Sequence, residues 1–263
     1  MAGPAVGVLH PGEMGAALAS VLRCAGLPVA WASAGRSAAT VRRAEAAGLE
    51  DVGTTAEVGR RSDVVLSVCP PHAAVDVARS LDGYEGIFVE ANAVSPATAR
   101  AIAAEIEHAG GTFVDGGIVG RPPPADATRL YLSGPSAEPV ARLFQGTAVD
   151  ARVLSDAVGD ASALKMAYAA WTKGTAALLL AILELARAEG VDEALRDEWR
   201  SSLPELPSQS QRAASSAEAK GWRWVAEMEQ IAATFAAAGL PSGFHDAAAE
   251  VFRSFGREPA EAR

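Results

Sequence analysis

Short apolar runs alternate with amphipathic segments through the first half of the chain. The runs are rich in β-branched residues and bounded by glycine, proline or polar positions, which is typical of strands. The expected strands cover residues 5–9, 29–32, 49–52, 63–69, 87–91 and 112–115, followed by a further pair at 129–133 and 152–154. Helices are expected between them, at 14–25 and 37–47 and from Ser95-Pro96, because serine caps helices and proline fits their first position. The pattern predicts an α/β fold with a Rossmann-type, doubly wound parallel sheet.

The pattern changes near residue 155. Beyond it, apolar residues recur at helical spacing and β-branched runs disappear. We therefore expect a Rossmann domain over residues 1–155 and a smaller all-α domain over residues 156–263. Residues 161–189 are apolar around most of the helix circumference, which predicts burial on several sides and a homodimer built on this helix. Residues 203–221 are rich in Ser, Gln and Pro, which predicts a loop or a poorly ordered connection between helices.

Composition and charge narrow the class of protein. The chain has 263 residues and a formal net charge of -9, with no concentration of basic residues, which argues against a nucleic-acid partner. No basic segment precedes an apolar run at the N-terminus, and the most apolar stretch, 174–183, is shorter than the roughly 20 residues that span a bilayer. Cys24 and Cys69 are too few for a zinc site or a disulfide framework, and we expect both to be buried. The expectation is a cytoplasmic protein with no metal and no membrane partner.

A glycine-rich turn follows the first strand and leads into a helix, which is where a dinucleotide fingerprint occurs. The segment reads His10-Pro11-Gly12-Glu13-Met14-Gly15, so the first glycine of the fingerprint is missing. Gly12 would let the backbone approach a pyrophosphate, and Gly15 would let the helix pack closely on the strand. Pro11 is expected to hold His10 extended. The sequence predicts that residues 10–14 bind a dinucleotide.

The residues after the second strand indicate which nicotinamide cofactor binds. An acidic residue here would hydrogen-bond the ribose hydroxyls of NAD, but the segment reads Ser33-Ala34-Gly35-Arg36-Ser37. The guanidinium of Arg36 and the hydroxyls of Ser33 and Ser37 suit a 2′-phosphate, which favours NADP(H). The alternative is that Ser37 only caps a helix whose exposed face carries Arg36.

Further patterns recur along the chain and are specific in combination. They are the glycine loop ending Gly12-x-Met14-Gly15, then Val68-Cys69-Pro70-Pro71, then Glu90-x-Asn92-Ala93-x-x-Pro96, and Gly159 followed by Lys165-Met166. Together they resemble the superfamily of β-hydroxyacid dehydrogenases and phosphogluconate dehydrogenase, and the C-terminal stretch from Gly221-Trp222 to His245 resembles a poorly characterised branch of it. The resemblance implies that Cys69, Pro70, Pro71 and Asn92 bind the cofactor. It also implies a catalytic lysine at Lys165, on the helix that starts the second domain.

The sequence departs from this family at the substrate. Asn92 stands where hydroxyisobutyrate-type enzymes have a serine, and Val119-Gly120-Arg121 stands where they have a Ser-Gly-Gly turn that holds the substrate carboxylate. Tyr168 and Ala169 replace their paired asparagines. The residues expected to contact substrate are Asn92, Ala93, Val119, Gly120, Arg121, Lys165, Tyr168 and His245. Arg121 would restore an anion site, or it is simply an exposed arginine before three prolines.

Lys165 is the expected proton-transfer residue, with Asn92 and Tyr168 as its catalytic neighbours. Only three of the 23 basic residues are lysines, and a lysine can release a proton where arginine cannot. Its neighbours are apolar, and burial lowers the pKa of an ammonium toward the ~7–8 that suits proton transfer. The alternative is a lysine whose stem is buried while its ammonium reaches solvent.

These observations predict an NADP(H)-dependent oxidoreductase. Its substrate would be a small, anionic hydroxy acid or the carbonyl counterpart, and it would act on a CH–OH group. The alternatives are an imine reductase of the same architecture and a noncatalytic NADP(H)-binding regulator.

Overall fold

The computed structural model describes residues 3–124 and 128–255. The chain divides into two compact units between Lys165 and Met166, and helix α7 (Asp160–Ala188) contributes residues to both. The boundary predicted after residue 155 coincides with the end of the last strand, whereas the first compact unit continues into the first turns of α7.

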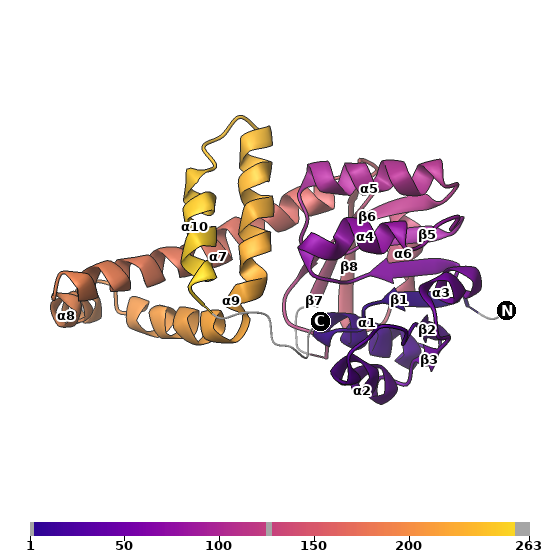
Figure 1. The fold of residues 1–263 in the computed structure, drawn as a ribbon, viewed down its shortest axis with the longest axis horizontal. Helices are drawn as coiled ribbons and strands as arrows, with labels where there is room; N and C mark the ends of the chain where they lie inside the picture. Colours follow the sequence, from indigo (N-terminus) through magenta and orange to yellow (C-terminus); the bar gives the residue numbers. More distant parts are fainter. Residues whose placement is uncertain (1–2, 125–127, 256–263) are drawn as a thin grey trace. The chain divides into compact units, whose positions relative to one another are not determined.

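The first unit is built on one mixed sheet, in which the strands are parallel except for one neighbouring pair (Figure 1). The strands are β1 (Val6–Leu9), β2 (Val29–Trp31), β3 (Glu50–Asp51), β4 (Val64–Ser67), β5 (Ile87–Glu90), β6 (Thr112–Val119), β7 (Thr128–Ser133) and β8 (Val149–Ser155). Their order is β3-β2-β1-β4-β5-β6-β7-β8, and only β6 and β7 are antiparallel. The predicted doubly wound Rossmann-type sheet is confirmed.

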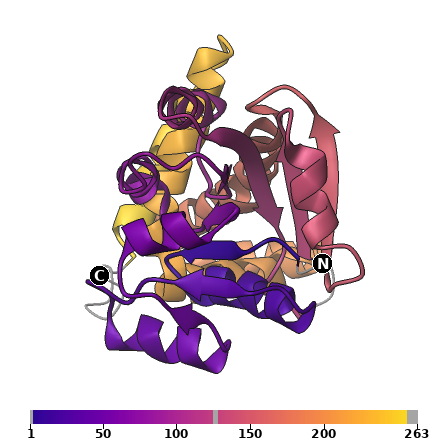
Figure 2. The ribbon, with the colours of Figure 1, turned by 90° about the vertical axis from the view of Figure 1, so that its right-hand side faces the viewer.

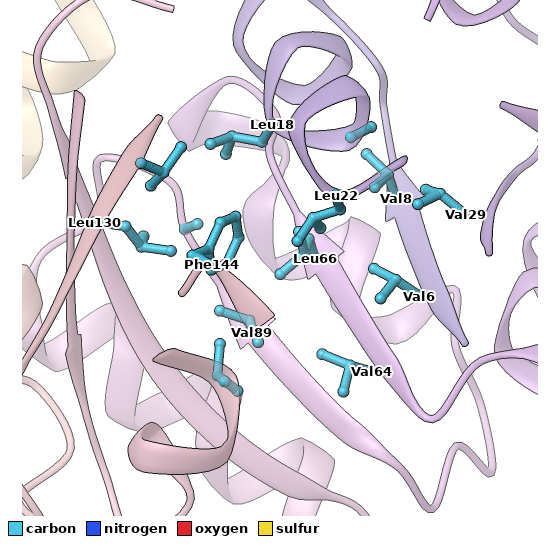
Figure 3. Close-up of a cluster of buried hydrophobic side chains, with 14 of the residues drawn as sticks. Val6, Val8, Leu18, Leu22, Val29, Val64, Leu66, Val89, Leu130 and Phe144 are labelled. Atoms are coloured by element: carbon cyan, nitrogen blue, oxygen red, sulfur yellow. The ribbon is translucent and has the colours of Figure 1, made fainter. Parts of the chain in front are cut away.

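Helices cover both faces of this sheet, as Figure 2 shows. They are α1 (Glu13–Cys24), α2 (Ala38–Ala46), α3 (Thr55–Arg61), the short 3-10 helix η1 (Pro71–Ala73), α4 (Ala74–Arg79), α5 (Pro96–His108) and α6 (Ala137–Leu143). One core packs α1, α2 and α6 on the sheet and includes Leu22, Leu66 and Phe144 (Figure 3), while the other packs α3, α4 and α5. Ser95 caps α5 as predicted, and Ser37 caps α2, because the side chain of each serine accepts a hydrogen bond from a backbone amide in the first turn.

Strand β6 is longer than the expected 112–115 because it continues past its parallel partner β5 to pair with β7. Two glycines, Gly116 and Gly117, occupy the extension. A Cβ on Gly116 would lie 2.9 Å from the Glu90 carbonyl oxygen, and one on Gly117 would lie 2.8 Å from the Ala161 carbonyl oxygen. Because glycine is rare within strands, the sequence pattern predicts that this strand ends before Gly116. The strand continues, and the two glycines are needed there because β5 and α7 pack closely against it.

The second unit is helical, as predicted, and holds most of α7 together with α8 (Asp192–Ser202), α9 (Leu206–Ala237) and α10 (Gly243–Arg253). The loop expected over residues 203–221 is wrong, since α9 covers most of it. Proline is tolerated in a first helical turn, where Pro207 lies. The buried residues of this segment, Ser210, Ala213, Ala217 and Gly221, recur at helical spacing, so its polar residues face outward.

Helix α7 is less buried within one chain than its apolar sequence predicts. Trp171 is 73% exposed, Leu178 58% and Leu185 62%. Among the described residues α7 is also the one helix that could cross a membrane by length and composition, with a mean hydropathy of 1.4 and 33% of its most apolar window buried. This is weak evidence, because core helices of globular proteins have the same length and composition.

Candidate functional site

The glycine loop after β1 has the shape of a fingerprint turn although its first glycine is a histidine. His10 adopts φ 61, so the expectation that Pro11 holds it extended is wrong. The Gly12 amide donates to the His10 carbonyl at 2.6 Å and closes a tight turn over Pro11. The first position of this loop needs a positive φ, which glycine takes freely and His10 takes at some conformational cost.

The two remaining glycines of the loop have different roles. A Cβ on Gly15 would lie 2.9 Å from the His10 carbonyl oxygen, so only glycine lets α1 pack this closely under the loop. A Cβ on Gly12 would meet nothing nearer than 3.9 Å, which leaves open space beside the backbone. Gly12 is the N-cap of α1, which begins at Glu13 and Met14, and no capping side chain occupies the backbone amides of the first turn. These amides and the positive end of the helix dipole are therefore available to an anion beside Gly12.

Arg36 is a partly buried cation close to this loop. Its Nε is buried and has no hydrogen-bond partner among the described residues. Burial lowers the pKa of Arg36, and Cys69 opposes that shift when its thiol is ionised. Burial, and then the charge of Arg36, lower the pKa of His10 to about 4, and the buried His10 Nδ1 has no partner in the described part of the chain either. His10, Arg36 and Cys69 follow β1, β2 and β4, which are neighbours in the sheet, so the three residues lie at the same edge of the sheet.

The other residues after β2 are already engaged. The Ser37 hydroxyl caps α2 through the Thr40 amide at 3.3 Å, as the alternative interpretation of that residue expects. The Ser33 amide donates to Asp51 Oδ1 at 3.1 Å, and Gly53 donates to the same oxygen at 2.9 Å. The pKa of Asp51 is lowered, chiefly by a hydrogen bond from the Ser33 side chain and then by the Gly53 and Ser33 amides, while slight burial opposes the shift.

Asp51 is an acidic residue that sequence reasoning missed. It stands at the end of β3, and the register of the parallel β2–β3 pair sets it opposite Trp31. No acidic residue follows β2 in the sequence, but the sheet supplies one from the neighbouring strand. The signal was present in the expected strand at 49–52, whose end would lie beside the end of β2 in a parallel sheet.

Asn92 connects the ends of β4 and β5. The Asn92 side chain donates through Nδ2 to Ser67 Oγ at 3.1 Å and accepts a short hydrogen bond at Oδ1 from the Cys69 backbone amide. The Asn92 backbone amide donates to Glu90 Oε1 at 3.1 Å. Asn92 therefore fixes the loop that contains Cys69 and Pro70, with Pro71 buried at the start of η1. Cys69 is half-buried, and burial together with Glu90 raises the pKa of its thiol to about 12. Cys24, expected to be buried, is exposed at the end of α1.

Glu90 is a fully buried carboxyl group that the sequence analysis treated only as part of a motif. Its Oε1 accepts from Asn92, while Oε2 has no partner among the described residues. Burial raises the pKa of Glu90 to about 8, and the neighbouring Asp115 adds to the shift. Glu90 and Asp115 are register partners on β5 and β6. One buried acid beside another is held in its protonated form at neutral pH.

Asp115 anchors the start of α7. Its carboxylate accepts four hydrogen bonds, from Ser133 Oγ at 3.0 Å, the Gly159 amide at 3.1 Å, and the amide and hydroxyl of Ser162 at 2.9 and 2.6 Å. The positive end of the helix dipole stabilises the same carboxylate. Asp115 therefore fixes the position and direction of the first turns of α7, on which Lys165 lies.

Lys165 reaches from α7 to the extension of β6. Its Nζ donates to the Ile118 carbonyl oxygen at 2.7 Å, and the side chain is half-buried. The path is open because residue 117 is glycine: a Cβ there would lie 3.1 Å from the Lys165 Cβ. A backbone carbonyl thus orients the ammonium.

The remaining candidates for substrate contact lie in different places. Within the first unit, Ala93 is half-buried, the Val119 side chain is buried, Gly120 adopts φ 116, and Arg121 is exposed before the proline run. Within the second unit, Tyr168 is 45% exposed on α7, and His245 is 8% exposed, with its ring 4.3 Å from that of Phe235. Burial lowers the pKa of His245, and its Nδ1 has no partner within the described ranges. No group of three potential metal ligands occurs in the described part of the chain.

A mostly parallel sheet with a glycine turn after β1, a helix N-terminus beside it, and an arginine at the same edge whose buried Nε has no partner among the described residues define a dinucleotide-binding domain. Residues 5–145 match the family described as the NAD binding domain of 6-phosphogluconate dehydrogenase, and the chain belongs to this family. Residues 186–255 match a domain of unknown function, DUF1932.

Similar proteins extend this assignment. An uncharacterized protein of Methanothermus fervidus is 34% identical over 163 residues, which cover 61% of this chain and 63% of the relative's length. A conserved protein of unknown function, with structural similarity to 3-hydroxyacid dehydrogenases, superimposes with a TM-score of 0.71 at 29% identity, over 95% of this chain and 96% of its own.

Two characterised enzymes share the fold at lower identity. The 3-hydroxyisobutyrate dehydrogenase of Mycobacterium tuberculosis has a TM-score of 0.73 at 18% identity, with 97% and 94% of the two chains covered. An imine reductase of Myxococcus stipitatus, in complex with NADP+, has a TM-score of 0.60 at 20% identity, with 95% and 93% covered. Together with the family, these findings show an NAD-binding fold of the 6-phosphogluconate dehydrogenase-like superfamily.

Proposed function

We propose that this protein transfers a hydride between NADP(H) and a small, anionic hydroxy acid or its carbonyl counterpart, with Lys165 as general acid and base. The observation that carries the proposal is the position of Lys165. Its ammonium is fixed by the Ile118 carbonyl at 2.7 Å, on a helix whose start is anchored by buried Asp115. A carbonyl oxygen orients an ammonium without taking its proton, so the proton remains available for transfer to a substrate.

The residues at the edge of the sheet fit a nicotinamide dinucleotide. The open space beside Gly12 and the N-terminus of α1 suit a pyrophosphate. The buried Nε of Arg36, unpartnered among the described residues, suits the 2′-phosphate of NADP, while Cys69, Pro70 and Asn92 form the next part of the edge. When bound, the cofactor accepts or donates the hydride.

Lys165 would move the proton that accompanies the hydride. In oxidation the neutral amine of Lys165 takes the proton of the substrate hydroxyl and becomes the ammonium, and in reduction the ammonium donates a proton to the developing alkoxide and becomes the neutral amine. The Ile118 carbonyl orients Nζ throughout, which shortens the search for a reactive geometry. Asn92 keeps both ends of its amide in the loop network, so we assign it a positioning role.

Cofactor preference is tested by titrating NADPH and NADH. We expect at least tenfold tighter binding of NADPH, and loss of that preference in Arg36→Ala, because the Arg36 guanidinium would pair with the 2′-phosphate that NADH lacks. Arg142→Ala, which removes an exposed arginine on α6, is the matched control. Unchanged NADPH affinity in Arg36→Ala would refute the assignment of the 2′-phosphate to Arg36.

The catalytic role is tested at Lys165 after screening hydroxy acids, keto acids and cyclic imines for changes in NADPH absorbance. Lys165→Met should bind NADPH normally and lose about 10²–10⁴ in turnover, the usual contribution of a general acid or base. Lys165→Arg should be nearly as inactive, since arginine keeps the charge and retains its proton. Lys220→Met, on exposed surface, is the control.

The outcomes of this screen separate the candidate functions. Wild-type turnover by Lys165→Arg would make Lys165 an electrostatic anchor only. Turnover of cyclic imines without carbonyl substrates would identify an imine reductase. NADPH binding with no turnover across the panel would favour a regulator.

A further inference from the structure

A row of polar side chains crosses one face of the sheet in the first unit. Its members occupy matching register positions on four neighbouring strands and are all fully buried: Ser67 on β4, Glu90 on β5, Asp115 on β6 and Ser133 on β7. Register partners project from the same face of a sheet, so these four side chains lie side by side. The residues two positions earlier on β4, β5 and β6 are Val65, Phe88 and Phe113, which are buried on that same face. The four residues, called the polar row below, therefore border an apolar layer.

The polar row has two hydrogen-bonded halves. In the half on β4 and β5, Asn92 hydrogen-bonds both members and also accepts from the Cys69 amide, so this half fixes the loop after β4, residues 68–70. In the half on β6 and β7, backbone amides at the start of α7 donate to both members at 2.9–3.1 Å. One half thus supports a loop that we propose to contact the cofactor, and the other supports the helix that carries Lys165.

The two halves meet where Glu90 lies beside Asp115. These residues are register partners on parallel strands, whose backbones run about 4.7–4.9 Å apart. Asp115 accepts four hydrogen bonds, which stabilise an ionised carboxylate, whereas Glu90 accepts the Asn92 amide and its Oε2 has no partner among the described residues. Two carboxyl groups this close and this buried do not both ionise. The geometry therefore gives the charge to Asp115 and leaves the proton on Glu90.

We infer that Glu90 is a positioning residue that joins the loop after β4 to the start of α7, because its neutral carboxyl group lets the two halves of the polar row stay in contact. Ionisation of Glu90 would put a second carboxylate beside Asp115, and repulsion would separate the halves. Glu90 acts through Asn92 and Asp115 rather than on substrate or cofactor. The consequence for the site rests on the proposed function: the cofactor loop and the helix that places Lys165 would lose their alignment together.

The titratable groups near Glu90 lie on the elements that surround it. Burial raises the pKa of Glu90 to about 8, and Asp115 on β6 adds to the shift. Burial and then Glu90 raise the pKa of the Cys69 thiol to about 12, so Cys69 is uncharged at neutral pH. On α5, Arg100 packs against the start of α7 and keeps its charge, and Lys165 donates to a backbone carbonyl of β6. As the pH rises from 7 to 9, ionisation of Glu90 adds a second negative charge to the polar row.

Hydrogen exchange followed by mass spectrometry tests the coupling without any cofactor. The segments compared are residues 66–75, around the loop after β4, and residues 159–165, at the start of α7. At pH 6 wild type and Glu90→Gln should protect both segments equally, since glutamine has the shape of a neutral glutamic acid and keeps its acceptor. At pH 9 both segments should exchange faster in wild type than in Glu90→Gln, because only wild type gains the second charge. Comparing the two proteins at one pH cancels the effect of pH on intrinsic exchange.

The controls separate a local link from a general loss of stability. Peptides from α6, which packs on the other face of the sheet, should exchange alike in both proteins. Glu107→Gln, at an exposed site on α5, should behave as wild type at both pH values. Faster exchange at pH 9 in only one of the two segments would overturn the coupling, as would equal acceleration in α6. Equal exchange of wild type and Glu90→Gln at pH 9 would overturn the role of Glu90.

NADPH titration between pH 7 and pH 9 gives a second readout. If binding requires neutral Glu90, the competent fraction falls from nearly all at pH 7 to about one tenth at pH 9, so the affinity of wild type should fall about tenfold. The affinity of Glu90→Gln should stay constant over this range. Lys165→Met should keep the wild-type dependence, because the titrating group is Glu90. An alkaline loss of affinity that persists in Glu90→Gln, or that disappears in Lys165→Met, would overturn the inference.

The two readouts distinguish failure of this inference from failure of the proposed function. The expected exchange behaviour in a protein that binds no NADPH at any pH would support the link through Glu90 and refute the proposed cofactor. NADPH affinity independent of pH, with equal exchange in wild type and Glu90→Gln, would leave the proposed function standing and overturn the link.

Discussion

Glu90→Gln isolates the effect of one buried acid on the pH dependence of stability. In the wild-type protein the Glu90 carboxyl group is fully buried and its pKa is raised from 4.5 to about 8. Glutamine has nearly the same shape, can still accept the Asn92 amide bond and does not titrate. The difference between the two proteins therefore reports the cost of ionising Glu90.

The sign follows from proton binding. Between pH 4.5 and 8 the unfolded chain releases the Glu90 proton while the folded chain retains it, so the free energy of unfolding falls as pH rises. The stabilisation is complete below about pH 4.5 and lost by about pH 8. At about 1.36 kcal/mol for each pH unit, this interval amounts to at most about 5 kcal/mol. Glu90→Gln should lack this loss.

The assay is urea denaturation at several values from pH 5 to pH 8.5, followed by circular dichroism. Wild type and Glu90→Gln should have similar midpoints at pH 5, and the variant should become progressively more stable by comparison as pH rises. Glu138→Gln, which changes an exposed glutamate on α6, should follow the wild type. Parallel curves for wild type and Glu90→Gln would show that Glu90 is ionised in the folded protein, and would refute the argument from burial.

Two further predictions concern the loop and the helix anchor. Gly15→Ala places a Cβ 2.9 Å from the His10 carbonyl oxygen, so it should lower the free energy of unfolding by about 1–3 kcal/mol and also lower NADPH affinity. Gly12→Ala has room in the fold and should lower NADPH affinity alone. Denaturation and NADPH titration of both variants test this, and equal losses of stability would contradict it. Asp115→Asn removes the charge of the carboxylate that accepts four hydrogen bonds at the start of α7, so it should lower the free energy of unfolding by about 2–4 kcal/mol. The loss is measured as a shift in the urea midpoint, with Asp156→Asn at an exposed site as the control. Equal shifts for the two variants would contradict the prediction.

The sheet was predictable because its strands are buried on both faces and read as apolar runs, and because the caps Ser37 and Ser95 follow local chemistry. Helix α9 was not, since its polar composition concealed a narrow buried face of small residues. The end of β6 was also missed, because Gly116 and Gly117 are unfavourable for a strand except where another backbone approaches closely.

The candidate site was predictable only where its residues are close in sequence. The glycine loop and Arg36 follow single strands, so their positions could be inferred. Asp51 reaches Ser33 through the pairing of two strands, and Asp115 reaches Ser162 across 47 positions. Such contacts depend on sheet register and helix docking, which no local pattern contains. The carbonyl that holds Lys165 belongs to this class as well.

The histidine in place of the first fingerprint glycine gives the loop a spectroscopic label that glycine could not provide. The chain contains four histidines, so the ring resonances of His10 can be assigned in a proton NMR spectrum with a single His10→Gly comparison. With its pKa lowered to about 4, the ring stays neutral at pH 7, and proton exchange does not broaden its signal. A nucleotide phosphate placed beside Gly12 would change the shielding of this ring. Occupancy of the dinucleotide site could then be followed by NMR in the native sequence, before any substrate is known.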